Sequence, residues 1–411
     1  MDNVSHTVAG LLLAEAAVQY RCLRGQPPPA SFGRAAYWVS GVANNLPDFD
    51  FLYSRITQPP TLGYLLHHRG HTHTLPVALL LAALLLGMVQ LGLRRRQSEL
   101  GHADWRWLWG LALLGSLAHI AMDFTNNYGV HPFWPLHNGW FYGDFVFIIE
   151  PLFFALGVPP LLASLRSPAM RVVFVLVLGA VLVLGWSMPW VPLLVAVVIT
   201  FVALIALVLA FRLPPARRIA VAFASALLVV LVFGGTHLLA KKHALSSLPA
   251  ASALQDLVLT PMPANPLCWS AWRVSSKAGT YVAERGVVAS LPALLSAERC
   301  SVELGDGSRE RAVVRLDAPE SPAVRWTGRY TAPVRALAEL ERESCFAAAF
   351  MRWARVPYST ERDGQIVVGD LRYDRAPEIE FAEFALPVGA PCPRFVPDWT
   401  PPREELLRGG K

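Results

Sequence analysis

Histidine and aspartate side chains gather in a few short stretches of an otherwise strongly apolar chain. Residues 67–73 alone hold four of the eleven histidines. Neutral imidazole and carboxylate groups are the usual protein ligands of zinc and similar divalent ions. The pattern therefore predicts a metal site built from four stretches: SHT (5–7), NNLPDFD (44–50), HHRGHTHT (67–74) and HIAMDFTNNYG (119–129).

The local sequence indicates how these stretches present their side chains. His119 and Asp123 are four residues apart at the end of an apolar helix, so both point off one face. Asp48 and Asp50 follow a proline that ends their helix. A glycine breaks any helix through 67–73, which leaves those imidazoles on a tight loop.

Each motif taken alone has a simpler explanation. HxxxD arises often by chance, and a histidine-rich loop can be a solvated surface. Four such stretches on one side of a membrane favour a metal site, and roughly five histidines and three aspartates would suffice for two ions. An unliganded carboxylate of the pair Asp48 and Asp50 could act as general base. Arg69 could hold an anionic substrate oxygen, or its side chain could instead extend toward the membrane surface.

The composition predicts a membrane protein. The 411 residues are 54% hydrophobic and only 16% charged. Residues 1–243 hold sixteen basic and nine acidic residues, against twenty and twenty-one in residues 244–411. Because the long apolar runs also lie in the first part, its basic excess indicates membrane topology rather than nucleic-acid binding. Most of these runs approach the length needed to cross a bilayer: 75–93, 107–122, 145–165, 172–186, 190–211 and 219–240.

Two shorter stretches, 7–20 and 33–46, precede these runs and are predicted to be helices that span the membrane or lie at its interface. With eight membrane helices and an outer N-terminus, twelve of the sixteen basic residues of the membrane part fall in inner loops. The positive-inside rule favours this orientation, which brings the histidine and aspartate stretches to the outer face. The inner loops are then 21–34, 94–106, 166–171 and 212–218.

The predicted fold is an all-α polytopic membrane domain of about six to eight helices (residues 1–243), followed by a small α+β extracytoplasmic domain (residues 244–411). In the second domain 273–285, 364–375 and 379–387 are expected to be strands, and 332–356 a long helix. This domain holds no histidine after His243, so we expect it to cover the membrane site or bind substrate. Its four cysteines predict two disulfides with the pairing open, or alternatively four buried thiols: Cys268, Cys300, Cys345 and Cys392.

In their order and spacing these motifs resemble the bacterial inner-membrane metal-dependent hydrolases of the YdjM type, a family also described as LexA-binding. The resemblance covers about residues 1–150 and rests on a histidine near the start, LPDFD, HRG-x-THT and HIAMDFTNNYGVHPFWP. A looser similarity to zinc-dependent phospholipase C and the P1-type nucleases implies phosphoester hydrolysis. Cytoplasmic LexA does not fit motifs on the outer face. The ligands that the family resemblance implies are His6, Asp48, Asp50, His68, His73, His119 and Asp123, with His67 and His71 as accessories.

These observations together predict a hydrolase of the bacterial inner membrane that uses one or two divalent ions, with Zn²⁺ favoured over Mn²⁺ or Fe²⁺. Its expected partners are the lipid bilayer and a phosphate-bearing or lipid-linked substrate, and no nucleic acid. The alternative is a non-enzymatic metal-binding scaffold or transporter. Stretches 172–186, 190–211 and 219–236 contain no charged residue, which argues against a transport path through them.

Overall fold

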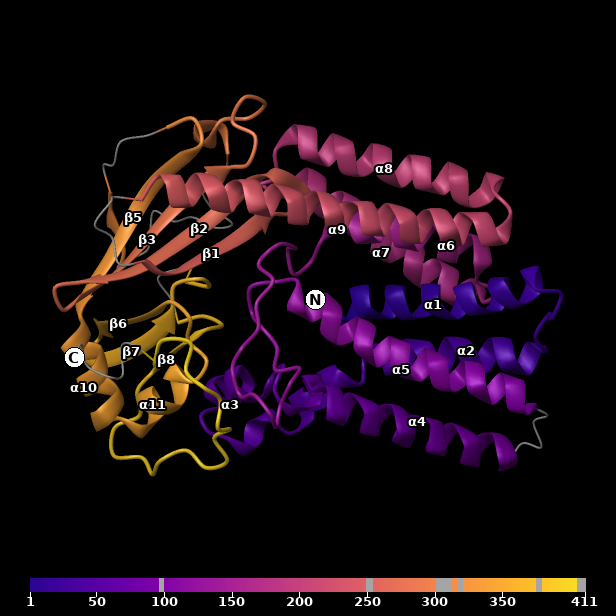
Figure 1. Cartoon of the computed structure of the whole chain (residues 1–411), viewed down its shortest axis with the longest axis horizontal. Coiled ribbons are helices and arrows are strands. Elements are labelled where there is room, and N and C mark those ends of the chain that lie inside the picture. Colours follow the sequence, from indigo (N-terminus) through magenta and orange to yellow (C-terminus); the bar gives the residue numbers. More distant parts are fainter. Residues whose placement is uncertain (96–99, 249–253, 301–311, 317–320, 375–378, 405–411) are drawn as a thin grey trace.

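The computed structural model describes residues 1–95, 100–248, 254–300, 312–316, 321–374 and 379–404. Long helices lie side by side at one end of the molecule, and two β-sheets with two short helices form the other end (Figure 1). The helical part therefore precedes an α+β part, as the sequence predicts.

The helical part is built from two groups of long helices. One group comprises α1 (Asn3–Leu23), α2 (Ala30–Ala43), α4 (Leu75–Arg95) and α5 (His102–Phe124). The other comprises α6 (Pro151–Ser164), α7 (Pro168–Ser187), α8 (Leu193–Arg212) and α9 (Pro215–Ser246). The groups meet where α1 packs on α6 (Figure 1). Short elements join the first group together: η1 (Pro47–Leu52), η2 (Ser54–Ile56), α3 (Pro60–His67) and η3 (His71–His73).

Small residues let the helices of the first group approach closely. A Cβ atom on Gly10 of α1 would lie 2.6 Å from the Ser40 carbonyl oxygen of α2. Close backbone approach at small residues is a common way for membrane helices to pack. The same group buries Phe32, Val39 and Leu108 completely, so its interior is closed to solvent.

Among the described residues, five helices are long and apolar enough to cross a membrane: α4, α5, α7, α8 and α9. Stretches 7–20 and 33–46 do form helices, α1 and α2, but these do not meet the same measure of length and apolarity. The run 145–165 is shorter as a helix than predicted, because α6 begins only at Pro151. Glu150 therefore caps this helix instead of lying within it, and its side chain accepts the Leu152 N–H.

The larger sheet is antiparallel, with strand order β1-β2-β3-β5-β4. The prediction of a single strand over 273–285 was wrong: Lys277 pairs with Thr280, and the chain reverses through Ala278 and Gly279, both at positive φ. Two positive φ angles are what a tight hairpin requires. The strands are β1 (Leu254–Met262), β2 (Asn265–Lys277), β3 (Thr280–Ala289), β4 (Val314–Arg315) and β5 (Val324–Pro333). The short helix η4 (Ala297–Arg299) follows β3.

The smaller sheet has the order β6-β7-β8, also antiparallel. The expected strands 364–375 and 379–387 are shorter, namely β7 (Gln365–Asp370) and β8 (Glu383–Ala385), beside β6 (Pro357–Arg362). Arg375, the last residue of the first of these predictions, lies outside the described residues. The helix expected over 332–356 is broken into α10 (Val334–Glu343) and α11 (Cys345–Met351). The break occurs because the Ser344 hydroxyl caps α11 by accepting the Ala347 N–H.

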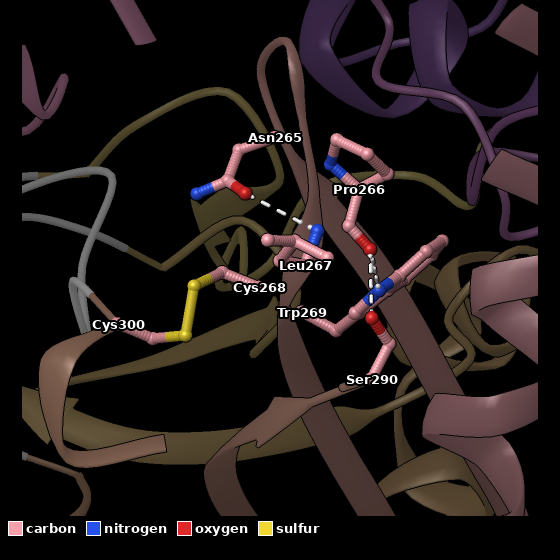
Figure 2. The surroundings of a disulfide bond; sticks show 7 residues. All are labelled: Asn265, Pro266, Leu267, Cys268, Trp269, Ser290 and Cys300. Carbon is pink, nitrogen blue, oxygen red and sulfur yellow. Dashed lines mark hydrogen bonds between the residues drawn. A yellow bond between two sulfur atoms is a disulfide. The ribbon is translucent and has the colours of Figure 1, made fainter. Parts of the chain in front are cut away.

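Both disulfides of the α+β part are formed, so the alternative of four buried thiols was wrong. Cys268 pairs with Cys300, and Cys345 pairs with Cys392. Figure 2 shows the first bond beside the Pro266 carbonyl, which accepts the Trp269 indole N–H and the Ser290 hydroxyl. Disulfides persist in oxidising compartments, so they are consistent with an extracytoplasmic location.

The α+β part packs directly on the segments that hold the histidines and aspartates. Leu62 and Leu66 of α3 share an apolar core with Phe350, Trp353 and Trp399. Polar contacts cross the same junction, where the Trp399 indole N–H donates to the Leu66 carbonyl (2.8 Å). The sheet part therefore covers this end of the helical part.

Candidate metal centre

Five of the predicted ligands come from three elements that converge at the end of the first helical group nearest the sheets. Asp48 and Asp50 lie on η1, His73 on η3, and His119 and Asp123 on the last turns of α5. All five side chains are buried, and only Asp48 exposes as much as 5% of its surface. Residues up to 75 positions apart in the sequence thus meet in one interior cluster.

The spacing of four ligand atoms is compatible with tetrahedral coordination of one ion. The Nε2 atoms of His73 and His119 lie 3.0 Å apart and 3.4 and 3.5 Å from Asp48 Oδ1. The same two nitrogens lie 3.1 and 3.4 Å from Asp123 Oδ2. Metal–ligand distances of about 2.0–2.1 Å place tetrahedral vertices about 3.3–3.4 Å apart. These four residues could therefore hold a divalent ion at their centre.

The hydrogen bonds of the two imidazoles turn their lone pairs toward that centre. His119 Nδ1 lies 2.8 Å from the Asn44 carbonyl oxygen, which can only accept, so Nδ1 carries the proton. His73 Nδ1 lies 3.2 Å from Thr72 Oγ1 and 3.4 Å from Asp50 Oδ2. Such partners fix the tautomer of metal-binding histidines in known sites. Two nitrogen lone pairs 3.0 Å apart beside carboxylates favour a cation between them.

A second group of possible ligands consists of Asp48, Asp50 and His68. It shares Asp48 with the first group, which is where a carboxylate bridging two ions would lie. Asp50 also has other partners, because its Oδ2 accepts the Arg69 backbone N–H (2.8 Å) and the Thr72 hydroxyl (3.2 Å). Asp50 therefore ties the loop 68–73 together as well as facing the cluster.

Arg69 is fully buried, and its guanidinium is engaged within the protein. Its Nε lies 3.0 Å from Asp123 Oδ2, and its Nη1 donates to Asn126 Oδ1 (2.6 Å). The backbone of Arg69 has a φ of 60°, which lets its N–H reach Asp50. Next to it, a Cβ on Gly70 would meet the His67 carbonyl oxygen at 2.8 Å, so the loop needs glycine there.

His6 reaches the cluster from α1. Its ring stacks on His119 with centroids 3.7 Å apart, and its Nε2 lies 3.3 Å from Asp123 Oδ1. The α-amino group of Met1 also contacts Asp123 Oδ1. Asp123 is thus the carboxylate on which most of the cluster converges.

Electrostatics keep the carboxylates of the η1 element ionised. Burial alone would raise the pKa of Asp48, but its contacts with His119 and His73 hold that pKa well below the usual range. Burial opposes ionisation of Asp50 in the same way, and His68 and His73 lower its pKa below the usual range. Burial also lowers the pKa of His68, so its imidazole is neutral near pH 7. Anionic carboxylates and neutral imidazoles are the forms that bind metal.

The remaining histidines of the predicted loop lie apart from the ligand groups. His67 contacts the Thr57 hydroxyl (2.8 Å), and His71 lies against the rings of Trp134 and Trp399. Sequence reasoning missed several supporting residues: Asn44, Thr72, Tyr64 and Asn126. Asn44 and Asn126 lie inside quoted motifs, but nothing in the pattern reveals a carbonyl or amide contact.

Comparison with known proteins finds a family match for the first part of the chain. Residues 1–191 match the YdjM inner membrane protein family. No curated protein matches the chain, and no solved structure matches it. The YdjM region includes every residue of the cluster and ends in the segment between α7 and α8. Helices α8 and α9 and both sheets therefore lie beyond it.

Proposed function

We propose that this protein is a membrane-bound metal-dependent hydrolase of phosphoesters, which acts on a phosphate-bearing, lipid-linked substrate at the outer face of the inner membrane. The observation that carries the proposal is the buried set of Asp48, His73, His119 and Asp123, whose ligand atoms all lie within 4.8 Å of one another. A bound divalent ion supplies Lewis acidity, which makes water a better nucleophile at neutral pH and polarises a phosphoryl oxygen. Zn²⁺ fits the nitrogen and oxygen donors, and Mn²⁺ or Fe²⁺ would accept the same set.

The individual residues take distinct roles in this proposal. His73, His119, Asp123 and Asp48 would hold the ion, and a second ion beside Asp48 would have to replace the contact between His68 Nδ1 and Asp50 Oδ1 (3.1 Å). Asp48 is the better candidate for orienting the attacking water, through its oxygen that does not face the ion, because both oxygens of Asp50 already have partners in the protein. His6 supports the set through its stack on His119.

Arg69 receives a positioning role, because its guanidinium is engaged by Asp123 and Asn126. Arg55 is better placed than Arg69 to bind an anionic substrate, because the Arg55 side chain is exposed. Arg55 lines a hollow of about 730 Å³ together with Phe51, Leu52 and Phe381, so a cation and apolar walls lie in one depression, which Glu380 also lines. Tyr64 lines the same hollow and stacks on His68 with centroids 4.7 Å apart. The Tyr64 ring therefore lies between the hollow and His68 of the cluster. The guanidinium of Arg55 and the apolar walls of the hollow suit an amphiphilic phosphate ester.

The test is hydrolysis of lipid-linked and soluble phosphoesters by the purified protein in detergent or liposomes. We expect chelator-sensitive turnover that is lost in Asp123→Ala and in His73→Ala, with lipid-linked esters cleaved faster than nitrophenyl phosphate. Arg55→Gln should raise KM severalfold with metal content unchanged, because it alters the hollow and not the ion. Turnover that survives both ligand substitutions would refute the assignment of the site.

A second function has its own support in the burial of the cluster. His73, His119 and Asp123 are 0% exposed, and a closed four-ligand set is typical of structural zinc. A non-enzymatic metal-binding scaffold or transporter is the corresponding alternative. Bound metal without turnover on a panel of phosphoesters, esters and amides would favour it over the hydrolase.

A further inference from the structure

A cavity of about 610 Å³ lies at the opposite end of the helical part from the metal centre. It opens between the C-terminal half of α1, the start of α2 and the end of α6. Three arginines line it, Arg34, Arg166 and Arg218, and each comes from a loop that the positive-inside rule assigns to the cytoplasm.

Glu15 is the acidic residue among those that line this cavity, and its carboxylate already accepts two hydrogen bonds. The three arginines outnumber it, so the lining has a net positive charge. Glu15 is 5% exposed and accepts the Tyr37 hydroxyl (2.5 Å) and the Gln19 amide (2.9 Å). Arg166 and Arg218 both lie close enough to Tyr37 to act on it electrostatically. Arg218 donates through Nη1 to the Ala210 carbonyl (3.3 Å), and its Nε is buried without a hydrogen-bond partner among the described residues.

A second, apolar hollow of about 190 Å³ begins at the same arginine. It runs between α6, α8 and α9 and is lined by Leu156, Val202 and Ala206 among other apolar residues. Arg218 lines both hollows, so a cationic chamber and an apolar groove between helices adjoin at this residue. Neighbouring hollows of these two kinds match the two halves of a charged lipid.

We propose that these adjoining hollows bind one anionic phospholipid from the cytoplasmic leaflet, with the headgroup phosphate among Arg34, Arg166 and Arg218 and part of one acyl chain along the groove. Guanidinium groups pair with phosphate through two parallel hydrogen bonds, which favours arginine at such sites. Basic pockets between helices on the cytoplasmic side are a known form of headgroup recognition. This site is independent of the metal centre and of the proposed hydrolase activity.

Native mass spectrometry of the full chain, with phosphatidylglycerol or phosphatidylcholine added in detergent, tests the proposal. We expect one retained phosphatidylglycerol and at least tenfold weaker retention of phosphatidylcholine. Arg166→Gln/Arg218→Gln should lose this preference at least tenfold. The matched control is Arg212→Gln/Arg217→Gln, which removes two exposed arginines of the same face that line neither hollow. Equal retention of the two lipids, or equal loss in both variants, would overturn the proposal.

Two further experiments distinguish binding of a lipid from binding of a free anion. Ala206→Trp narrows the groove and leaves all three arginines in place, so lipid retention should fall severalfold. Millimolar inorganic phosphate should fail to displace the lipid. Full displacement by phosphate, or unchanged retention in a folded Ala206→Trp variant, would show a phosphate site without a tail and refute the lipid assignment. Unchanged metal content and thermal midpoint report that each variant is folded.

Discussion

The two groups of long helices are both rich in apolar residues, but they bury different shares of them. In the most apolar stretch of α5, 44% of the residues are buried inside the protein, against 11% in α7. Helix α5 turns Ser116, His119 and Asp123 inward, whereas α7 buries only Phe174 and Leu178. A helix that carries polar chemistry must be shielded by protein, because lipid offers its polar groups no partners.

This contrast explains how the metal centre is assembled. Helices α1, α2 and α4 surround α5, so its polar end meets the η1 and η3 segments instead of lipid. Helices α7 and α8 expose most of their surface and make apolar contacts with their neighbours. The first group therefore holds the candidate ligands in place, whereas the second group mainly anchors the molecule in the bilayer.

The largest expected effect is loss of metal from a double variant of the first group. His73→Ala/His119→Ala removes two of four candidate ligands, so metal content should fall from about one or two ions per chain to below a tenth. Elemental analysis of protein purified without added metal or a histidine tag measures it. His102→Ala is the matched control, because this exposed histidine lies at the other end of α5. An equal metal content in the double variant and the wild type would end the metal hypothesis.

A smaller loss of metal affinity is expected for Asp50→Asn, because this substitution removes a carboxylate that contacts two histidines of the cluster. Asp50 faces the rings of His68 and His73, and loss of such outer contacts typically weakens metal binding about 10–100-fold. Competition with a fluorescent chelator reports the affinity. Asp398→Asn, at a carboxylate with 92% exposure, should leave it unchanged. If Asp50→Asn binds metal as tightly as the wild type, Asp50 has no part in shaping the centre.

Acid should weaken the packing within the α+β part. Burial opposes ionisation of Asp256, but Arg355 and Arg403 outweigh it and lower its pKa to about 2. A pKa lowered by folding stabilises the protein above the ordinary value near 4, and the gain is lost as pH falls toward 2; it amounts to about 2 kcal/mol. Unfolding midpoints at pH 5 and pH 3 should therefore differ less in Asp256→Asn than in the wild type. Asp363→Asn, at an exposed turn, should retain the full difference.

The smallest effect is expected in the anchoring group. Leu176 of α7 is 66% exposed to the surroundings, so Leu176→Ala should change the unfolding free energy by no more than about 0.5 kcal/mol. Thermal unfolding in detergent measures it. A loss of several kcal/mol would mean that α7 packs against another protein surface, and the division into two groups would need revision.

The sequence predicted the parts of the centre that depend on periodicity and chemistry. His119 and Asp123 do face one way, and their four-residue spacing was sufficient to predict it. The Asn44 carbonyl that orients His119 could not be predicted, because any residue offers a carbonyl and only the crossing of α2 and α5 selects this one. The histidine pattern of the loop 67–73 gave no basis for separating His73 from His67, and only the family resemblance ranked His73 as a ligand and His67 as an accessory.

The predictions for the α+β part were wrong at positions where the local sequence signal is weak. Ala278–Gly279 is a weak turn signal between two β-rich runs, so one strand was predicted where a hairpin forms. Ser344 looks like an ordinary polar position of an amphipathic helix, yet it ends α10 and caps α11. The pairing of the four cysteines depends on distances across the fold, which spacing alone does not give.

Helix α9 belongs to both halves of the molecule. Its 32 residues extend about 48 Å, well beyond a hydrocarbon core of about 30 Å. Its last turns enter the core of the larger sheet, where Ala240 and Ala244 pack with Trp269 and Trp326. A helix tilts when the surrounding bilayer becomes thinner, and this one must then carry the sheet with it. The acyl-chain length of a reconstituted membrane should therefore change the position of the sheet part that covers the candidate metal centre.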